Sequence, residues 1–252
     1  MRKRNILLMI LTCIIVVLVV INSYLLIAID KDMKEYQDAV VEYEEIAQQN
    51  ITEIKATKPE ETYSELEVNH DNLASINPDY IGWLYFPYLE ISYPIVQETT
   101  VNEYLRTTFY GEHNSSGSIF MDLYSSKDFS GYHNVLFGHN MKNNTMFGKF
   151  KELYRNEDTD ITSNPYVYIY TKDGVLKYKI FAYYQTVYNS DSYKLVNDLY
   201  EYEHFVNYIK MQDTIYFDDT VGFFDNTSIL TLSTCSGKSG GDTRFVIHCI
   251  RE

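Results

Sequence analysis

Cysteine is scarce in this chain, which has only Cys13, Cys235 and Cys249 among its 252 residues. Small exported domains that depend on disulfides carry a denser set of cysteines at regular spacings. Cys13 also lies inside a long apolar run, far from the other two. The sequence therefore excludes a disulfide framework as the basis of the fold.

Basic residues are outnumbered, since 21 Lys and Arg stand against 35 Asp and Glu and the formal net charge is −14. An acidic chain is a poor ligand for phosphate backbones, which argues against nucleic acid as a partner. Acidic pairs such as Asp218-Asp219 lack the spacing of a calcium-binding loop. We interpret them as loop charges and expect neither a metal nor a cofactor.

Charged residues are absent from residues 5–29, a run of 25. A helix of that length crosses a hydrocarbon core of ~30 Å at 1.5 Å per residue with some tilt. Residues 2–4 are basic, so the positive-inside rule places residues 1–4 in the cytoplasm and everything after residue 30 outside. We predict a single-pass cell-membrane protein whose signal anchor is residues 5–29.

Two other interpretations of this run were weighed. A cleaved signal peptide has an apolar core of ~7–15 residues and a small-residue cleavage site, whereas this run is longer and residues 22–26 form a poor site. A lipoprotein signal at Cys13 requires a small residue before the cysteine, and Thr12 stands there instead. The run favours an uncleaved anchor.

Residues 30–70 are predicted to form an acidic helical stalk. Residues 30–67 contain 12 acids and 4 bases, and apolar residues recur near helical spacing over 30–56. These apolar residues are Tyr36, Val40, Tyr43, Ile46 and Ala47. The helix could be a solvated stalk, or its apolar stripe could pack on the domain. A mixture of the two is favoured, with a break at residues 57–61.

Residues 71–252 are predicted to form one mainly β domain. Short β-branched and aromatic runs alternate there with turn residues, a pattern typical of strands. The candidate strands are residues 81–84, 91–96, 118–121, 134–137, 166–171, 175–187, 228–234 and 244–250. Apolar residues at 195, 199, 202, 206 and 209 predict a helix inserted between late strands, with Asp191 or Ser192 as its N-cap. The sum is a mostly antiparallel barrel or sandwich with a few helices.

Cys235 is the candidate nucleophile, because it ends the strand-like run TLSTC directly before a polar, glycine-rich loop over residues 236–241. The alternative is a structural cysteine or a disulfide with Cys249. In a hairpin that sets Arg244 opposite Cys235, Cys249 lies about 17 Å further along, at ~3.3 Å per residue. A disulfide requires Cα atoms within about 7 Å. The geometry that would build a site at Cys235 therefore forbids that bridge.

His139 is the candidate proton carrier among six histidines. It follows the run Val135–Gly138, which places it at a strand end where the glycine lets the backbone turn. His133, in the preceding loop, is the second candidate, and His248 alternates within a strand and is interpreted as packing. A thiol with the ordinary pKa of ~8.5 is mostly protonated at neutral pH, and a neighbouring histidine can activate it or protonate a leaving amine.

Arg244 opens the run TRFVIHCI, just past the glycine-rich loop. An arginine is by default a surface charge. At this place it is also a candidate oxyanion stabiliser, because a guanidinium stays charged and presents fixed donors to a developing anion.

These residues stand in motifs that resemble the sortases, and class B sortases specifically, over roughly residues 71–252. The matching motifs are TLSTC (231–235), RFVIH (244–248), NVLFGHNMKNNTMFGKF (134–150), INPDYIGWLYFPYLEISYPIVQ (76–97) and SGSIFMD (116–122). The helix near 192–211 is similar to the one that class B members insert between their sixth and seventh strands.

The resemblance implies a closed barrel of about eight strands and a cysteine transpeptidase on the outside of a Gram-positive cell. Cys235 would be the nucleophile, His139 the proton-transfer partner and Arg244 the oxyanion stabiliser, while Ser233 would line the substrate groove. The substrates would be surface proteins with a C-terminal sorting signal of the NP-x-T-x type. They would be cut after threonine through a thioacyl enzyme and passed to a peptidoglycan precursor or cross-bridge amine.

Two alternatives stay open on sequence alone. A membrane-anchored cysteine endopeptidase would use the same three residues with water as the acceptor. A non-catalytic surface-binding module would retain its function without Cys235. The sequence does not identify the substrate proteins, the acceptor amine, the oligomeric state, the protonation of the Cys235–His139 pair, or whether proteins are anchored to the wall or polymerised.

Overall fold

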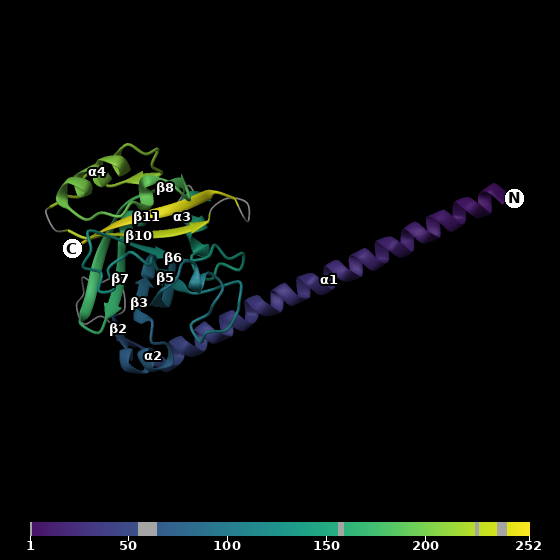
Figure 1. Cartoon of the computed structure of the whole chain (residues 1–252), viewed down its shortest axis with the longest axis horizontal. Coiled ribbons are helices and arrows are strands. Elements are labelled where there is room, and N and C mark those ends of the chain that lie inside the picture. The colour runs from purple at the N-terminus through teal and green to yellow at the C-terminus, as the bar shows by residue number, and fades with distance from the viewer. Residues whose placement is uncertain (1, 55–64, 156–158, 225–226, 236–240) are drawn as a thin grey trace.

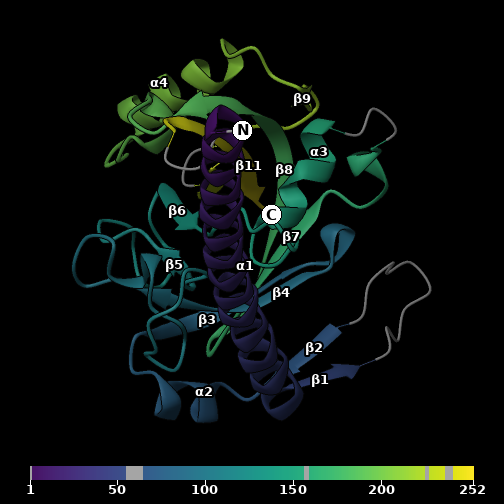
Figure 2. The ribbon, with the colours of Figure 1, turned by 90° about the vertical axis from the view of Figure 1, so that its right-hand side faces the viewer.

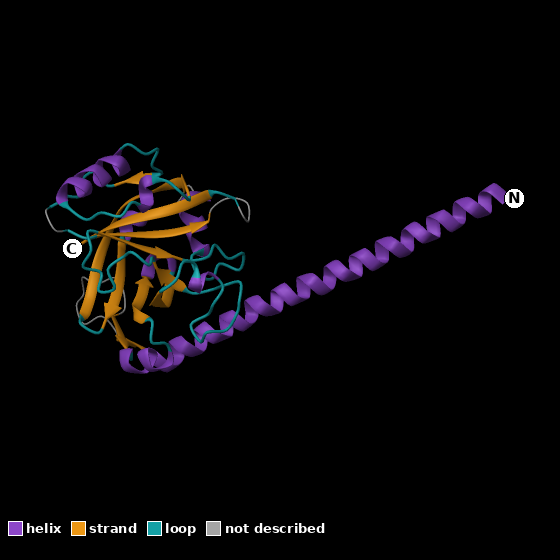
Figure 3. Ribbon diagram, viewed as in Figure 1, coloured by secondary structure: helices purple, strands orange, loops and turns teal. Residues whose placement is uncertain are grey.

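The computed structural model describes residues 2–54, 65–155, 159–224, 227–235 and 241–252, with the side chains of residues 2–4 and 235 left out. A rounded, mainly β body carries one long helix that projects from it (Figure 1). Strands make up most of the body and short helices lie around it (Figure 3).

Helix α1 (Arg2–Asn50) is a single unbroken helix of 49 residues, about 74 Å long at 1.5 Å per residue. Its first part, residues 5–34, is exposed on all sides. By length and composition α1 is a candidate membrane span, with a mean hydropathy of 3.0 in its most apolar window. An N-terminal apolar helix alone is weak evidence for such a span.

The last turns of α1 pack on the body through the apolar stripe that the sequence predicted. Ala39, Tyr43 and Ile46 are buried, and Tyr36 and Ala47 are partly buried against the same core. The exposed first part and the docked second part together form the mixture that the sequence favoured.

The prediction that this helix continues to residue 56 was wrong. Strand β1 (Ile51–Ile54) begins directly after Asn50 and pairs with β2 (Glu65–Val68). The β-branched residues of β1 favour a strand, and the Asn50 carbonyl accepts a hydrogen bond from the amide of Asn69 instead of continuing the helix. The predicted break at 57–61 falls outside the described residues.

The body is a barrel of eight strands. They are β3 (Tyr80–Phe86), β4 (Ile91–Gln97), β5 (Ile119–Met121), β6 (His133–Phe137), β7 (Tyr166–Thr171), β8 (Gly174–Val187), β10 (Ile229–Cys235) and β11 (Thr243–Arg251). Their order is β11-β10-β6-β5-β4-β3-β7-β8, and pairing of β11 with β8 closes the ring. Only β4–β5 and β6–β10 are parallel pairs. The mainly β class and the closed eight-stranded barrel are confirmed, and β9 (Tyr216–Phe217) adds a short edge on β8.

Two apolar cores lie on opposite faces of β10 and β11. Leu230, Leu232, Phe245 and Ile247 face the large core inside the barrel. Ile229, Val246 and Ile250 face a second core outside it, which helix α4 (Leu199–Lys210) covers with Tyr202, Phe205 and Ile209.

The inserted helix is confirmed, but its predicted N-cap was wrong. Asp191 and Ser192 form the short 3₁₀ turn η5 (Asp191–Tyr193), and α4 begins later. Asp198 is its N-cap, because its carboxylate accepts a hydrogen bond from the Glu201 amide at 2.8 Å. Glu201 in turn accepts from the Asn197 amide at 2.9 Å, so the cap and the third helical residue fix the start together.

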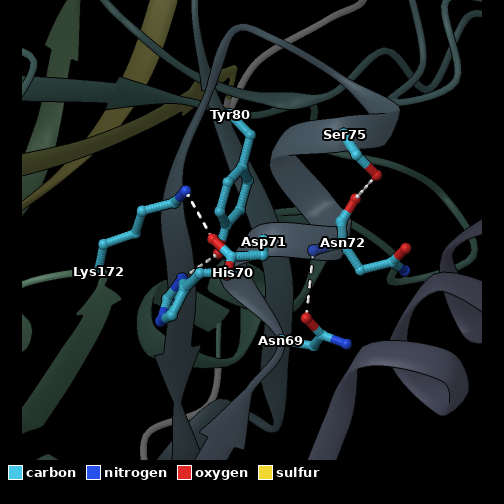
Figure 4. A network of polar contacts seen from close by, with 7 residues as sticks. All are labelled: Asn69, His70, Asp71, Asn72, Ser75, Tyr80 and Lys172. Carbon is cyan, nitrogen blue, oxygen red and sulfur yellow. Dashed lines mark hydrogen bonds and ion pairs between the residues drawn. The ribbon is translucent and has the colours of Figure 1, made fainter.

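Two short helices, α2 and α3, complete the body. Helix α2 (His70–Ile76), next to the end of α1, is capped by Asn69, whose side chain accepts from the Asn72 amide at 3.1 Å. Lys172, in the turn between β7 and β8, pairs with Asp71 at 2.9 Å (Figure 4). Both charged groups are largely exposed, so this pair adds little to stability. Helix α3 (Lys151–Arg155) follows the 3₁₀ turn η3 (Gly148–Phe150).

Candidate active site

The parallel pair β6–β10 brings His139 and Cys235 to equivalent positions. Phe137 pairs with Ser233 in the ladder, and the amide of Gly138 donates to the carbonyl of Ser233 at 3.1 Å. His139 is two residues beyond Phe137, and Cys235 is two residues beyond Ser233. Because adjacent strands are about 4.8 Å apart, the two backbones are neighbours where both strands end.

The antiparallel pair β10–β11 sets Arg244 opposite Cys235. Cys235 therefore pairs with Arg244 on one side, and on its other side lies β6, the strand that leads into the turn carrying His139. The same register pairs Cys249 with Leu230, five residues from Cys235. Cys249 is a free cysteine buried in the barrel, where burial raises the pKa of its thiol. The expected incompatibility between the site and a Cys235–Cys249 disulfide agrees with this register.

His139 is held by the carbonyl of Leu105, which accepts a hydrogen bond from Nε2 at 2.6 Å. A carbonyl oxygen only accepts, so Nε2 carries the proton and Nδ1 is the nitrogen left for proton transfer. Burial lowers the pKa of His139, although the Leu105 carbonyl opposes this shift, and the nearby Arg106 adds to the lowering. The site favours a neutral imidazole with a defined tautomer.

Gly138 is required by the packing around the turn that presents His139. A Cβ at this position would lie 2.5 Å from Cδ1 of Ile119 and 2.7 Å from Cδ2 of Phe147. The His139 carbonyl also accepts from the Phe147 amide at 3.0 Å. The turn is therefore fixed from both sides.

Arg244 is half-buried and its side chain is held locally. Nη1 donates to the carbonyls of Gly241 at 2.8 Å and Thr243 at 3.1 Å. The guanidinium carbon lies 5.9 Å from the centre of the Tyr188 ring, within the range of a cation–π contact. These contacts place a permanent positive charge beside the end of β10.

Ser233 is buried, and its hydroxyl shares a hydrogen bond of 2.8 Å with the hydroxyl of Tyr193. The Tyr193 ring stacks on Phe137, with ring centres 5.9 Å apart and planes at 28°. Tyr193 comes from the turn η5, between β8 and α4. Its side chain lies beside the ends of β6 and β10, where it contacts Phe137 and Ser233. Sequence reasoning missed Tyr193 because nothing local links it to a strand forty residues away.

Leu105 was missed for a different reason. Its contribution to the site is a backbone carbonyl at the end of the 3₁₀ turn η2 (Glu103–Leu105). Every residue has such a group, so the sequence holds no signal for it.

His133 and His248 belong to a buried network instead of the site. His133 hydrogen-bonds to the Lys194 carbonyl through Nδ1 at 2.8 Å and to Thr231 Oγ1 through Nε2 at 2.7 Å. Thr231 Oγ1 contacts His248 Nδ1 at 2.8 Å, and His248 Nε2 contacts the Tyr184 hydroxyl at 3.0 Å. His133, the second candidate for proton transfer, lies at the opposite end of β6 from His139.

The carbonyl at one end of this network fixes the direction of every bond. Burial keeps His133 neutral, so with Nδ1–H donating to the Lys194 carbonyl, Nε2 accepts from the Thr231 hydroxyl, which in turn accepts from His248 Nδ1–H. Both imidazoles are neutral in this arrangement. Burial lowers the pKa of His133 to about 4 and that of His248 well below its ordinary value.

No group of three or more His, Cys, Asp or Glu side chains suited to a metal ion occurs among the described residues. The site combines a cysteine at the end of β10, a neutral histidine just beyond the end of β6 and an arginine near the start of β11. This set suits nucleophilic attack on a carbonyl with proton transfer and oxyanion stabilisation.

Comparison with known proteins gives one consistent result. A family model described as the Sortase domain matches residues 84–252. Sortase B of Staphylococcus aureus is 28% identical over 180 residues, which cover 70% of this chain and 71% of that protein. Sortase B of Listeria monocytogenes is 30% identical over 167 residues, or 65% of each protein. The crystal structure of sortase B from B. anthracis in complex with AAEK1 has a TM-score of 0.70, is 27% identical, and covers 87% of this chain and 98% of that one.

Proposed function

The chain belongs to the sortase family as a class B cysteine transpeptidase that attaches proteins to the cell wall, and on that premise we propose its mechanism and topology. It cuts an NP-x-T-x sorting signal after the threonine, through a thioacyl enzyme, while anchored in the membrane by residues 5–29. Cys235 is the nucleophile, His139 the proton carrier and Arg244 the oxyanion stabiliser.

The register of β6, β10 and β11 is the observation that carries this proposal. Phe137 pairs with Ser233, and Cys235 pairs with Arg244. A single pair could be accidental. Three reactive residue types at one end of three adjacent strands form a constellation with the chemistry for acyl transfer.

In the first half-reaction, the sulfur of Cys235 bonds to the threonine carbonyl carbon. Burial favours the neutral form of His139, so the thiol proton passes to Nδ1 as the sulfur attacks. When the tetrahedral intermediate collapses, the carbon–nitrogen bond breaks and the leaving amine takes that proton from His139. The product is a thioester on Cys235.

In the second half-reaction, an amine from the wall precursor or cross-bridge attacks the thioester. His139 accepts the proton of the attacking amine, and the carbon–sulfur bond breaks. The proton returns to the sulfur, which restores the neutral pair. In both half-reactions the charged oxygen forms beside Arg244, whose guanidinium stabilises it.

Ser233 and Tyr193 are proposed to line the groove for the sorting signal. Their hydroxyls already contact each other at 2.8 Å beside the ends of β6 and β10. Because Ser233 is buried, a peptide lying there would meet the Tyr193 side chain, which Ser233 and the Phe137 ring hold in place.

The proposed topology has a cytoplasmic N-terminus and an extracellular catalytic domain, residues 71–252, joined to the anchor by residues 30–70. Its support is the charge-free run at 5–29 with basic residues before it. A substrate that is also held at the membrane reaches the site at a raised effective concentration.

The test uses the full chain in detergent with an NPQTN-type peptide, with and without a glycine oligomer or a diaminopimelate-type amine. Mass spectrometry scores the products, and Cys235→Ala is the control. We expect a threonine-ended fragment joined to the amine, and none from the variant. Release of the free acid alone, whatever amine is added, would favour the endopeptidase. Product formation by Cys235→Ala would contradict the proposed nucleophile.

A further inference from the structure

Helix α1 changes its surroundings abruptly along its length. Side chains 5–34 are exposed, and the apolar part ends at Ile29. Glu35 and Tyr36 are the first side chains of α1 that the body partly covers. About 9 Å of continuous helix separates Ile29 from Glu35. The anchor and the body are therefore joined by a short, regular helical segment.

The docked part of α1 is tied to the segment that precedes β5. The Glu35 carbonyl accepts from Asn114 Nδ2 at 2.9 Å, and its carboxylate accepts from the Ser115 amide at 2.6 Å. Two turns later, the Tyr43 hydroxyl donates to the Gly117 carbonyl at 2.7 Å in a buried contact. Bonds two turns apart on the same segment prevent the helix from swivelling on the body.

This segment also contacts the support of His139. Gly117 has φ +55°, and a Cβ on it would lie 2.6 Å from the carbonyl oxygen of Leu105. That oxygen accepts the hydrogen bond from His139 Nε2. Tyr43, Gly117, Leu105 and His139 thus form one line of contacts from α1 to the imidazole, so the site has a fixed position relative to the helix.

The site lies at the end of the barrel toward which α1 projects. The C-terminus of the chain follows β11 and lies on the far side of the body from the N-terminal half of α1 (Figure 1). Arg244, at the start of β11, is at the other end of that strand, together with the ends of β6 and β10. Seen from the N-terminal side, α1 crosses in front of β11, and β6 lies to the left of it in this view (Figure 2).

We propose that α1 is a rigid strut that holds the candidate active site facing the bilayer at a fixed height. The partner of this end of the barrel is a lipid surface, and the substrate is a peptide segment that leaves that surface through a short spacer. A flexible tether would let the site sample many heights, whereas a helix that is continuous through residues 30–34 does not. The inference rests on the proposed function and its membrane anchor.

The test uses the full chain in phosphatidylcholine–phosphatidylglycerol vesicles and two substrates. One is a soluble NPQTN-type peptide, and the other carries the same motif, a spacer and a transmembrane segment. Seven residues of an alanine-rich helical sequence inserted after Asp32 would raise the body by about 10 Å without a large rotation. Seven Gly and Ser residues at the same place give a control of equal length without stiffness.

The rigid insertion is expected to lower turnover of the tethered substrate about tenfold, because a tether that is too short for the span loses its effective concentration. The rate with the soluble peptide should stay unchanged. Adding about three residues to the spacer, at ~3.3 Å each, should restore the tethered rate for the rigid insertion. The Gly-Ser insertion should lower turnover of the tethered substrate less than the rigid insertion does, since it allows the body to approach the bilayer.

Equal turnover of the tethered substrate by the unmodified chain and the rigid insertion would overturn the strut and leave the proposed function intact. If turnover of the tethered substrate falls and lengthening the spacer does not restore it, that result would also contradict the strut. If neither substrate gives a product that depends on Cys235, the proposed function fails, and the strut fails with it.

Discussion

His139 donates a hydrogen bond from Nε2 to the carbonyl oxygen of Leu105, at 2.6 Å. This bond fixes the tautomer of the proposed proton carrier and leaves Nδ1 for the chemistry. It also makes the activity depend on a backbone carbonyl in the loop between β4 and β5. Changes in that loop should therefore act on the rate of the chemical step.

Gly117→Ala is expected to lower kcat about tenfold or more, because a 1 Å displacement of a catalytic group is costly. Its Cβ would meet the carbonyls of Leu105 and Tyr104 at 2.6 Å. Gly111→Ala is the matched control, since Gly111 also has a positive φ, of +86°, but open space around it. Steady-state kinetics of both variants separates the contact from backbone strain. Equal losses in the two would argue against a role for the Leu105 carbonyl.

Tyr193→Phe is expected to raise KM for the sorting peptide and leave kcat nearly unchanged. The change removes the hydroxyl that contacts Ser233 at 2.8 Å but keeps the ring that stacks on Phe137. If that hydroxyl also bonds to the bound peptide, as proposed for the groove, the loss of one neutral hydrogen bond to the peptide is worth about 1 kcal/mol, or about fivefold in KM. Peptide titration of the variant gives the measurement. A fall in kcat with constant KM would place Tyr193 in the chemical step instead of the groove.

The free energy of unfolding should fall as the pH drops from about 6.5 toward 4. Burial holds the pKa of His133 at about 4 in the folded protein, whereas an unfolded histidine has its ordinary value near 6.5. Between these values the unfolded chain binds a proton that the folded chain excludes. The stability from the neutral imidazole is thus complete above about pH 6.5, and His133 alone contributes a loss of about 3 kcal/mol by pH 4.

Chemical denaturation of the full chain in detergent at several pH values checks this. In His133→Asn the free energy of unfolding should depend less steeply on pH, because one buried imidazole is gone. His204→Asn, on the exposed side of α4, is the control and should leave that pH dependence unchanged. Carboxylates also titrate in this range, so the difference between the variants carries the argument. Identical slopes for all three proteins would be inconsistent with a neutral, buried His133.

A charged, membrane-impermeant thiol reagent is expected to form one adduct on the full chain in vesicles, at Cys235. Cys249 is buried in the barrel and its pKa is raised by burial, so little thiolate is available there. Cys13 lies in the proposed anchor. Mass spectrometry of Cys235→Ala should show no adduct, and Cys249→Ala should still show one. An adduct on Cys249 in the native protein would mean that this part of the core opens.

The sequence predicted Cys235, His139 and Arg244 as a set because each stands beside a local signal, a strand end, a glycine turn or a glycine-rich loop. It also anticipated the register that sets Cys235 opposite Arg244. It placed His133 second, although that residue is buried in a hydrogen-bond network. In the sequence, a catalytic histidine and a structural histidine near a turn have the same local pattern. Only their burial in the folded protein distinguishes them.

Local patterns by themselves determined the apolar first part of α1, the alternating strands and the amphipathic helix, since these depend on neighbouring residues in the chain. The extent of the helix before β1 and the cap at Asp198 were decided by hydrogen bonds that compete at each element's end. Tertiary structure alone decided the parallel pairing of β6 with β10, the hydrogen bond from His139 to the Leu105 carbonyl and the hydrogen bond between the Tyr193 and Ser233 hydroxyls. Those contacts join residues 34 to 96 positions apart in the sequence, and only closure of the barrel brings them together.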